Sequence, residues 1–293
     1  MRVVVLGTAA GGGLPQWNCA CELCARCRAG DADVPPRTQD CVAISATGRE
    51  WYLLNASPDL RAQIVETAEL APGPGRRETP VRGVLLTDAE LDHALGLALL
   101  REGPDIAVWA PKPVAGALAD GFPVRDIVSR YHSWDWREAT GEFTVDDGRL
   151  ECAAFPLSGK RPRYAADAAD APDWVVAYRV RDAATGGTLV YAPCLADWPP
   201  GFDEFVDGAD LLLVDGTFFT SGEMSRATGK DAGQGRMGHL PITESLHRLS
   251  GVGFRAYTHL NNTNPVADAA SPERAEVAAR GAHILDDGAR FDL

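Results

Sequence analysis

Residues 87–97, TDAELDHALGL, limit the fold of this chain more than any other stretch. They follow an apolar run over residues 81–86 that is typical of a buried strand, and they lead into leucines and alanines at helical spacing. Carboxylates that crowd a turn repel one another, so a bound metal ion is one explanation for the pattern. An acidic first helical turn, favoured by the helix dipole, is the other, but it leaves His93 unexplained. The side chains concerned are Asp88, Glu90, Asp92 and His93.

Four cysteines lie within nine residues, at the spacing C-x-C-x2-C-x2-C. Tetrahedral zinc binds four such ligands, with Zn–S distances of about 2.3 Å, and short loops of this kind fold around it. The spacing predicts a closed structural zinc site in residues 19–27, with Cys19, Cys21, Cys24 and Cys27 as ligands. A fourth ligand from elsewhere, replacing Cys27 or Cys19, is the alternative. An iron-sulfur cluster competes, although its usual spacings differ.

The composition is that of an ordinary globular protein, with 45% hydrophobic and 24% charged residues among 293. A net charge of -13 argues against nucleic acid and anionic membrane surfaces as partners. No apolar run approaches the roughly 20 residues of a membrane helix, and the short apolar start does not match a signal peptide. We therefore expect a cytoplasmic protein. No long linker interrupts the chain, so we predict one domain over residues 1–293.

Residues 7–13, GTAAGGG, follow a predicted first strand. Their spacing does not fit the dinucleotide fingerprint, and Pro15 follows instead of a helix. A close approach of the backbone to a neighbouring site is the better interpretation.

Further candidate residues stand where apolar segments meet polar loops. His239 and His259 have this setting, and Asp215 ends a buried strand, where a carboxylate serves either a site or a turn. The aromatic segment 130–136 lines a pocket or forms a packed surface loop. Residues 158–171 hold three basic side chains that meet an anionic substrate or only solvent. We predict substrate contacts at Trp134, Asp215 and Asn262.

Acids and histidines at strand ends of a mixed α/β chain resemble the metallo-β-lactamase superfamily, whose signature is H-x-H-x-D-H. The matching stretch here is residues 88–93, DAELDH. More specifically, the chain resembles the coenzyme PQQ synthesis protein B family. The motifs that carry this resemblance span nearly the whole chain: VVLGTAAGGGLPQWNCAC, NASPDLR, TDAELDH, LLLVDGTF, MGHLPI and THLNNTNP. It implies an αββα sandwich, two mixed sheets flanked by helices, with the metal site at strand ends along one edge.

The resemblance extends to phosphodiesterases of the superfamily, in which five histidines and two aspartates hold two metals. By position, this chain keeps Asp92, His93 and His259, which form a 2-His-1-carboxylate set suited to one Fe²⁺ or another divalent metal. Asp88 and Glu90 replace histidines, and they tune the site, hold a second weak cation or contact substrate. Ser158 lies near the place of another histidine and Cys194 near that of the bridging aspartate. His239 matches a catalytic histidine that transfers protons.

The resemblance implies a role in the biosynthesis of pyrroloquinoline quinone (PQQ), which is built from a glutamate and a tyrosine. We expect an iron-dependent oxygenase that hydroxylates the tyrosine ring of a cross-linked Glu-Tyr intermediate. A carrier that moves PQQ or its precursor towards the periplasm is one alternative, and a metallo-hydrolase of the superfamily's usual kind is another. The expected partners are the small or dipeptide-derived precursor and other PQQ biosynthesis proteins, with a homodimer left open.

Overall fold

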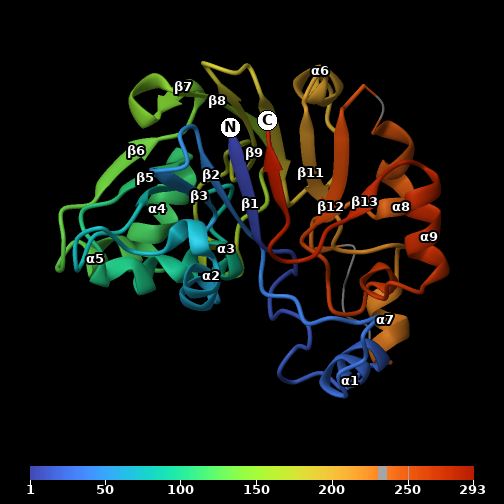
Figure 1. Ribbon diagram of the computed structural model, residues 1–293. Coiled ribbons are helices and arrows are strands. Elements are labelled where there is room, and N and C mark those ends of the chain that lie inside the picture. Colours follow the sequence, from blue (N-terminus) through green and yellow to red (C-terminus); the bar gives the residue numbers. More distant parts are fainter. Residues whose placement is uncertain (230–235, 250) are drawn as a thin grey trace.

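The computed structural model describes residues 1–229, 236–249 and 251–293. Its strands form two sheets of seven strands each (Figure 1). The first sheet has the order β14 (Arg290–Asp292), β1 (Arg2–Gly7), β2 (Cys41–Ser45), β3 (Trp51–Leu54), β4 (Val81–Leu85), β5 (Ala107–Ala110) and β6 (Asp135–Glu138). The second has the order β13 (His283–Ile284), β12 (Phe254–Thr258), β11 (Leu211–Asp215), β10 (Thr188–Ala192), β9 (Val175–Asp182), β8 (Leu150–Ser158) and β7 (Gly141–Val145).

Both sheets are mixed. In the first, β14, β1, β2 and β3 pair antiparallel, whereas β3 to β6 are parallel. In the second, β7 to β10 are antiparallel, whereas β10 to β13 are parallel. The parallel halves need crossover connections, and these connections carry the helices.

The side chains of each strand alternate between two apolar layers. In β1, Val3 and Val5 face the layer between the sheets, while Val4 and Leu6 face the outer layer of the first sheet. That outer layer is covered by α2 (Leu60–Glu66), α4 (Lys112–Asp120) and α5 (Val124–Val128). The outer layer of the second sheet is covered by α6 (Phe202–Val206), α8 (Ile242–Ser245) and α9 (Pro272–Ala279), as Figure 1 shows. The predicted αββα sandwich is confirmed.

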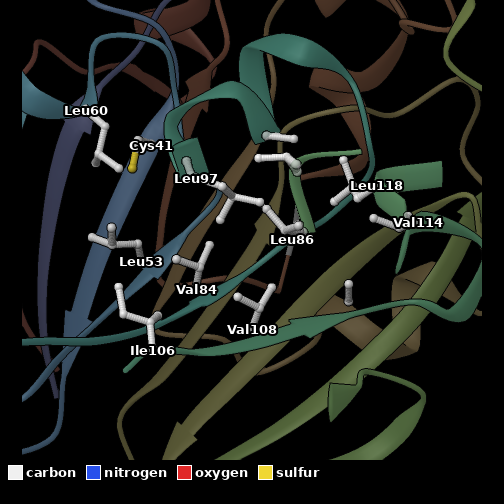
Figure 2. Packing of buried hydrophobic residues seen from close by; sticks show 14 of the residues in the cluster. Cys41, Leu53, Leu60, Val84, Leu86, Leu97, Ile106, Val108, Val114 and Leu118 are labelled. Carbon is white, nitrogen blue, oxygen red and sulfur yellow. The ribbon is translucent and has the colours of Figure 1, made fainter. Parts of the chain in front are cut away.

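The outer core of the first sheet anchors both sides of the 87–97 turn. Leu86 directly precedes this stretch and Leu97 is its last residue, and both lie in the cluster that also contains Val84 and Val108 (Figure 2). The helix after the turn is α3 (Leu91–Ala94), which continues as a 3-10 helix over Leu95–Glu102. The backbone N–H of Gly96 donates to the carbonyl of Ala56 at 2.9 Å, outside the helix, so the α-helical ladder ends there.

Two short helices lie beyond the sheets. They are α1 (Glu22–Arg28), which follows Cys21, and α7 (Glu223–Thr228), and both lie at the end of the sandwich away from the chain termini (Figure 1). In the part of the chain that the structure describes, no helix is long and apolar enough to cross a membrane.

We predict that Leu97→Ala lowers the free energy of unfolding by about 2–5 kcal/mol, because it leaves a cavity in a closely packed cluster. Leu99 lies in the same 3-10 helix but is 40% exposed. Leu99→Ala is therefore the matched control, with an expected loss below about 1 kcal/mol. Urea unfolding midpoints measure both changes. Equal losses would show that the turn does not depend on this core.

Candidate metal centre

The candidate metal centre lies at the carboxyl ends of parallel strands of both sheets. Asp88 follows β4, Asp215 ends β11 and His259 follows β12. Sheets with parallel strands place their ligands at such ends. Among the described residues, two groups here have ligand atoms within 4.8 Å of one another: His93, Cys194 and His259, and Asp215, His239 and His259.

His93 is fully buried, and a carboxylate orients its ring. Its Nδ1 lies 2.7 Å from Oδ2 of Asp88, which also accepts a 2.8 Å hydrogen bond from the Thr87 hydroxyl. The other oxygen of Asp88 accepts the backbone N–H of Glu90 at 2.9 Å. A carboxylate can only accept, so the proton of neutral His93 sits on Nδ1 and Nε2 carries a lone pair. Among the described residues, Nε2 has no hydrogen-bond partner.

His259 and Asp92 face one another across the centre. Nε2 of His259 lies 3.3 Å from Oδ2 of Asp92. The ring centroids of His259 and His93 are 5.1 Å apart. The backbone of His259 has a φ of 57°, in the left-handed region that residues other than glycine rarely adopt. Such conformations cluster at functional sites, where surrounding contacts hold them in place.

Asp215 determines the protons of two histidines. Its Oδ2 lies 2.7 Å from Nδ1 of His239, and its Oδ1 accepts the Thr217 hydroxyl at 2.6 Å. The single hydroxyl proton of Thr217 is then used, so Thr217 accepts from Nδ1 of His259 at 2.8 Å. Both imidazoles are thereby protonated on Nδ1, which leaves each Nε2 as an acceptor. Both oxygens of Asp215 and the Nδ1 atoms of His239 and His259 are thus already used in hydrogen bonds.

The centre is short of positive charge. Burial would lower the pKa of His93, but the carboxylates of Asp88 and Asp92 outweigh it and raise the pKa to about 10. A proton on Nε2 of His93 would be a buried donor without an acceptor. Burial, together with the nearby Asp88 carboxylate, raises the pKa of the Cys194 thiol, so a thiolate forms there only beside a cation. The donor set of two imidazoles, a thiol and Asp92 therefore fits a divalent metal ion.

The structure places Asp88 and Glu90 apart from each other. Asp88 supports His93 from behind, with both of its oxygens in hydrogen bonds. Glu90 pairs with Nζ of Lys160 at 3.1 Å. The hydrogen bond from Glu90 N to Asp88 closes a turn, so the two carboxylates do not project from an extended segment.

The predicted substrate residues are distributed differently. Trp134 is buried in the outer core of the first sheet, in the same cluster as the buried residues of α4 and α5. Asp215 is buried and is used by Leu195 N, Thr217 and His239. Asn262 is buried beside the cysteine loop, where its amide lies near three thiols. None of the three lines the cavity above the centre.

That cavity has a volume of about 740 Å³ and is lined by Asp92, Cys194, His239 and His259. His239 lines this cavity, and its ring centroid lies 5.3 Å from that of His259. The glycine loop forms part of the wall, and a Cβ on Gly11 would lie 3.1 Å from Oδ2 of Asp92. This is the close backbone approach that the loop predicted. Basic side chains also line the cavity: Lys160, Arg161, Arg163 and Arg236.

The cysteine loop brings three of its four thiols together. The sulfur atoms of Cys19, Cys21 and Cys24 lie within 4.8 Å of one another, whereas Cys27 is outside this group. Cys27 is on the buried side of α1 and packs in a small apolar cluster with Leu14. The sequence spacing alone, with Cys27 three residues after Cys24, did not indicate that the thiol of Cys27 lies outside the group.

Sequence reasoning did not single out Thr217 or Glu223, and it placed Lys160 only in a basic patch. Thr217 links Asp215 to His259, and Lys160 pairs with Glu90. Glu223, at the start of α7, accepts hydrogen bonds from Phe219 N and from the Thr263 hydroxyl. For Thr217, the signal in the sequence was its position two residues after Asp215 in the motif LLLVDGTF.

Comparison with known proteins agrees with this geometry. A sequence model described as a β-lactamase superfamily domain matches residues 50–259, which is more than half of the chain. A diphosphatase from the PhnP family shares the fold, with a TM-score of 0.69 at 16% identity over 100% of this chain and 97% of that one. Fold and site thus place the chain in the metallo-β-lactamase class.

Closer relatives define the family. The chain is 38% identical over 307 residues to coenzyme PQQ synthesis protein B of Pseudomonas putida and 40% identical over 303 residues to that of Azotobacter vinelandii, each with 100% of both chains covered. The crystal structure of Zn²⁺-bound PqqB from Methylobacterium extorquens matches with a TM-score of 0.92 and 37% identity, again over 100% of both chains. The chain belongs to the coenzyme PQQ synthesis protein B family.

We predict that Asp88→Asn weakens divalent metal binding at the centre by about 10–100-fold, because the amide no longer fixes the proton on Nδ1 of His93. Glu90→Gln is the matched control: it removes a carboxylate from the same turn but leaves His93 oriented, and we expect little change. Competition with a chelator gives both dissociation constants. If Glu90→Gln weakens binding as much as Asp88→Asn, Glu90 is a ligand after all.

Burial raises the pKa of Glu223 to about 7, although its hydrogen bonds oppose this. Between pH 4.5 and about 7, the folded state therefore keeps a proton on Glu223 that the unfolded chain has released. The stability that this proton confers is fully present below pH 4.5 and is lost as the pH rises through about 7. We predict that Glu223→Gln, which imitates the protonated acid, matches wild type near pH 5 and exceeds it by about 2–3 kcal/mol at pH 8. Urea unfolding at both pH values measures this, and an equal difference at each pH would refute it.

Proposed function

We propose that this protein acts in PQQ biosynthesis as a metal-dependent oxygenase with iron at the centre. Asp92, His93 and His259 would hold the ion, with Cys194 close to them. The observation that supports this most is the Nε2 atom of His93, which is buried and has no hydrogen-bond partner among the described residues, in a ring whose centroid lies 5.1 Å from that of His259. Two imidazoles and one carboxylate form the set that non-haem iron oxygenases use, and bound iron would supply the activation of O₂.

The protein's own residues supply binding and proton transfer in this proposal. The Nε2 of His239 accepts a proton, since Asp215 holds the other ring proton on Nδ1. A phenol in the cavity is a suitable donor, and the carboxylate of Asp215 stabilises the imidazolium that forms. The substrate would be the tyrosine ring of a cross-linked Glu-Tyr intermediate, as the family's role in PQQ synthesis suggests.

The charge of the cavity supports an anionic substrate on an otherwise acidic protein. Lys160 is balanced by Glu90 and Arg161 by Asp170. In the described part of the chain, no carboxylate pairs with Arg163 within 4.0 Å, so its guanidinium remains to bind a carboxylate of the substrate. An acidic precursor would be drawn to this side of the molecule despite the net charge.

Two alternatives fit the centre less well. A hydrolase with two metals would need further ligands, whereas Asp88 and Glu90 stand at the two positions where the superfamily signature has histidines. A carrier for PQQ or its precursor is favoured by the basic residues of the cavity, and it would need no metal. Binding of PQQ to metal-free protein distinguishes it, because a carrier holds PQQ tightly without metal. A homodimer and contacts with other PQQ biosynthesis proteins remain predictions.

We predict that protein reconstituted anaerobically with Fe²⁺, then given O₂, a two-electron reductant such as ascorbate and the Glu-Tyr precursor, yields a product heavier by one oxygen atom, while the second oxygen atom of O₂ is reduced to water. Asp92→Asn should lower the yield by at least about tenfold, because it removes a ligand. Glu142→Gln, on β7 away from the centre, is the control and should match wild type. Mass spectrometry of the product measures the outcome. No gain in mass, with the Asp92 variant equal to wild type, would contradict the proposal.

A further inference from the structure

Asp40 is a buried carboxylate that joins the two sheets close to the metal centre. It directly precedes β2 of the first sheet, whereas its side-chain partners belong to the second sheet. Its Oδ1 accepts the hydroxyl of Thr258, the last residue of β12, and its Oδ2 accepts the phenol hydroxyl of Tyr191 in β10. All three side chains are completely buried. These contacts hold the second sheet one residue before His259 and three residues before Cys194.

The same hydrogen-bond network reaches the ligands of the first sheet. The backbone N–H of Thr87 donates to Oδ1 of Asn55 at 2.9 Å, so the other end of this amide, Nδ2, is the donor. Nδ2 of Asn55 donates to the Tyr191 oxygen at 3.1 Å and to the Thr87 hydroxyl at 3.0 Å. Each hydroxyl then gives its own proton to a carboxylate, Tyr191 to Asp40 and Thr87 to Asp88. A continuous chain of hydrogen bonds thus runs from Asp40 to the carboxylate that orients the first-sheet imidazole.

Asp40 differs from the other carboxylates around the centre because it has no cationic partner of its own. Asp88, Asp92 and Asp215 each have a histidine nitrogen within 3.3 Å. Among the described residues, no lysine, arginine or histidine nitrogen lies within 4.0 Å of the Asp40 carboxylate, whose two oxygens accept from neutral hydroxyls. A buried charge without a counter-ion is strongly unfavourable. A neutral side chain could join the same hydroxyls at a lower cost, so the carboxylate requires a positive charge nearby.

The metal centre is the source of positive charge that lies near Asp40. Burial raises the pKa of Asp40, and the charges of His259 and His93 oppose this rise most. A divalent ion held by these two imidazoles would bring a larger positive charge to the same place. The cost of burying the carboxylate is then offset when the ion binds.

We propose that Asp40 is a positioning residue of the metal centre. Its hydrogen bonds to Tyr191 and Thr258 hold the ligands of the second sheet against those of the first, and the bound cation balances its charge. Asp40 does not line the cavity of the centre, so it acts through these two neighbours. The inference rests on the part of the proposed function that places a divalent ion at the centre, and not on the oxygenase reaction.

Mn²⁺ is a suitable probe, because it favours carboxylate over thiolate ligands and so reports on the centre and not on the cysteine loop. Electron paramagnetic resonance counts the free ion, whose six-line signal is lost on binding, and a titration gives the Kd. We expect Asp40→Asn to weaken Mn²⁺ binding about tenfold. Asp182→Asn is the matched control, since Asp182 is equally buried but pairs with the N-terminal ammonium group at 3.1 Å. This variant should bind Mn²⁺ as wild type does.

Urea unfolding of the metal-free proteins separates a positioning role from a structural one. Asp40→Asn removes a buried charge that has no counter-ion, so we expect its unfolding midpoint to equal or exceed that of wild type. Asp182→Asn breaks an ion pair and should unfold at a lower urea concentration. The two variants are therefore expected to differ in opposite ways in metal affinity and in stability.

The proposal is overturned if Asp40→Asn binds Mn²⁺ as tightly as wild type. It is also overturned if this variant binds weakly but unfolds at a lower urea concentration without metal, because Asp40 would then be a structural residue only. Asp92→Asn, which removes a ligand, tests the centre itself. If Asp92→Asn loses Mn²⁺ and Asp40→Asn does not, this inference alone fails. If neither variant loses it, the ligand set of the proposed function fails as well.

Discussion

The metal centre depends on one property of carboxylates, which is that an ionised carboxylate accepts hydrogen bonds and never donates them. Asp88 therefore holds a proton on the inner nitrogen of His93, and Asp215 does the same for His239. Through the hydroxyl of Thr217 the effect of Asp215 reaches His259 as well. Each imidazole is left with a bare Nε2. Two buried carboxylates thus define the chemistry of three histidines.

This arrangement bears on the proposal that the centre holds one metal ion and not two. The Asp88 carboxylate stands where the superfamily signature has its first histidine, and it works from behind His93 instead of binding a second ion. Glu90, at the second position, neutralises Lys160. The ammonium group of Lys160 thus lines the cavity wall. The ammonium can attract a carboxylate but cannot polarise a water molecule as a metal does.

Local sequence patterns were enough for the parts of the structure that rest on local physics. Apolar runs predicted the strands, and the resemblance to the superfamily grouped Asp92 and His93 with His259. The errors concern side chains whose partners are distant in sequence. Trp134 is as suitable for a pocket as for a core, and only the packing of α4 and α5 decides. Asn262 meets the cysteines across about 240 residues of chain, a contact that no spacing rule contains.

The loop after β12 brings these separate effects together. His259 holds a left-handed backbone conformation that costs about 1–3 kcal/mol for a residue with a side chain. Three contacts offset this cost: Leu260 N donates to Thr8 O at 2.8 Å, Asn261 N to Thr217 O at 3.0 Å, and the Asn264 amide to Gly216 O at 2.7 Å. They join the loop to the glycine segment and to the end of β11. The same loop presents Asn262 to the thiols of the cysteine loop, so an imidazole of the metal centre and an amide beside the thiols stand on a single backbone held from both sides.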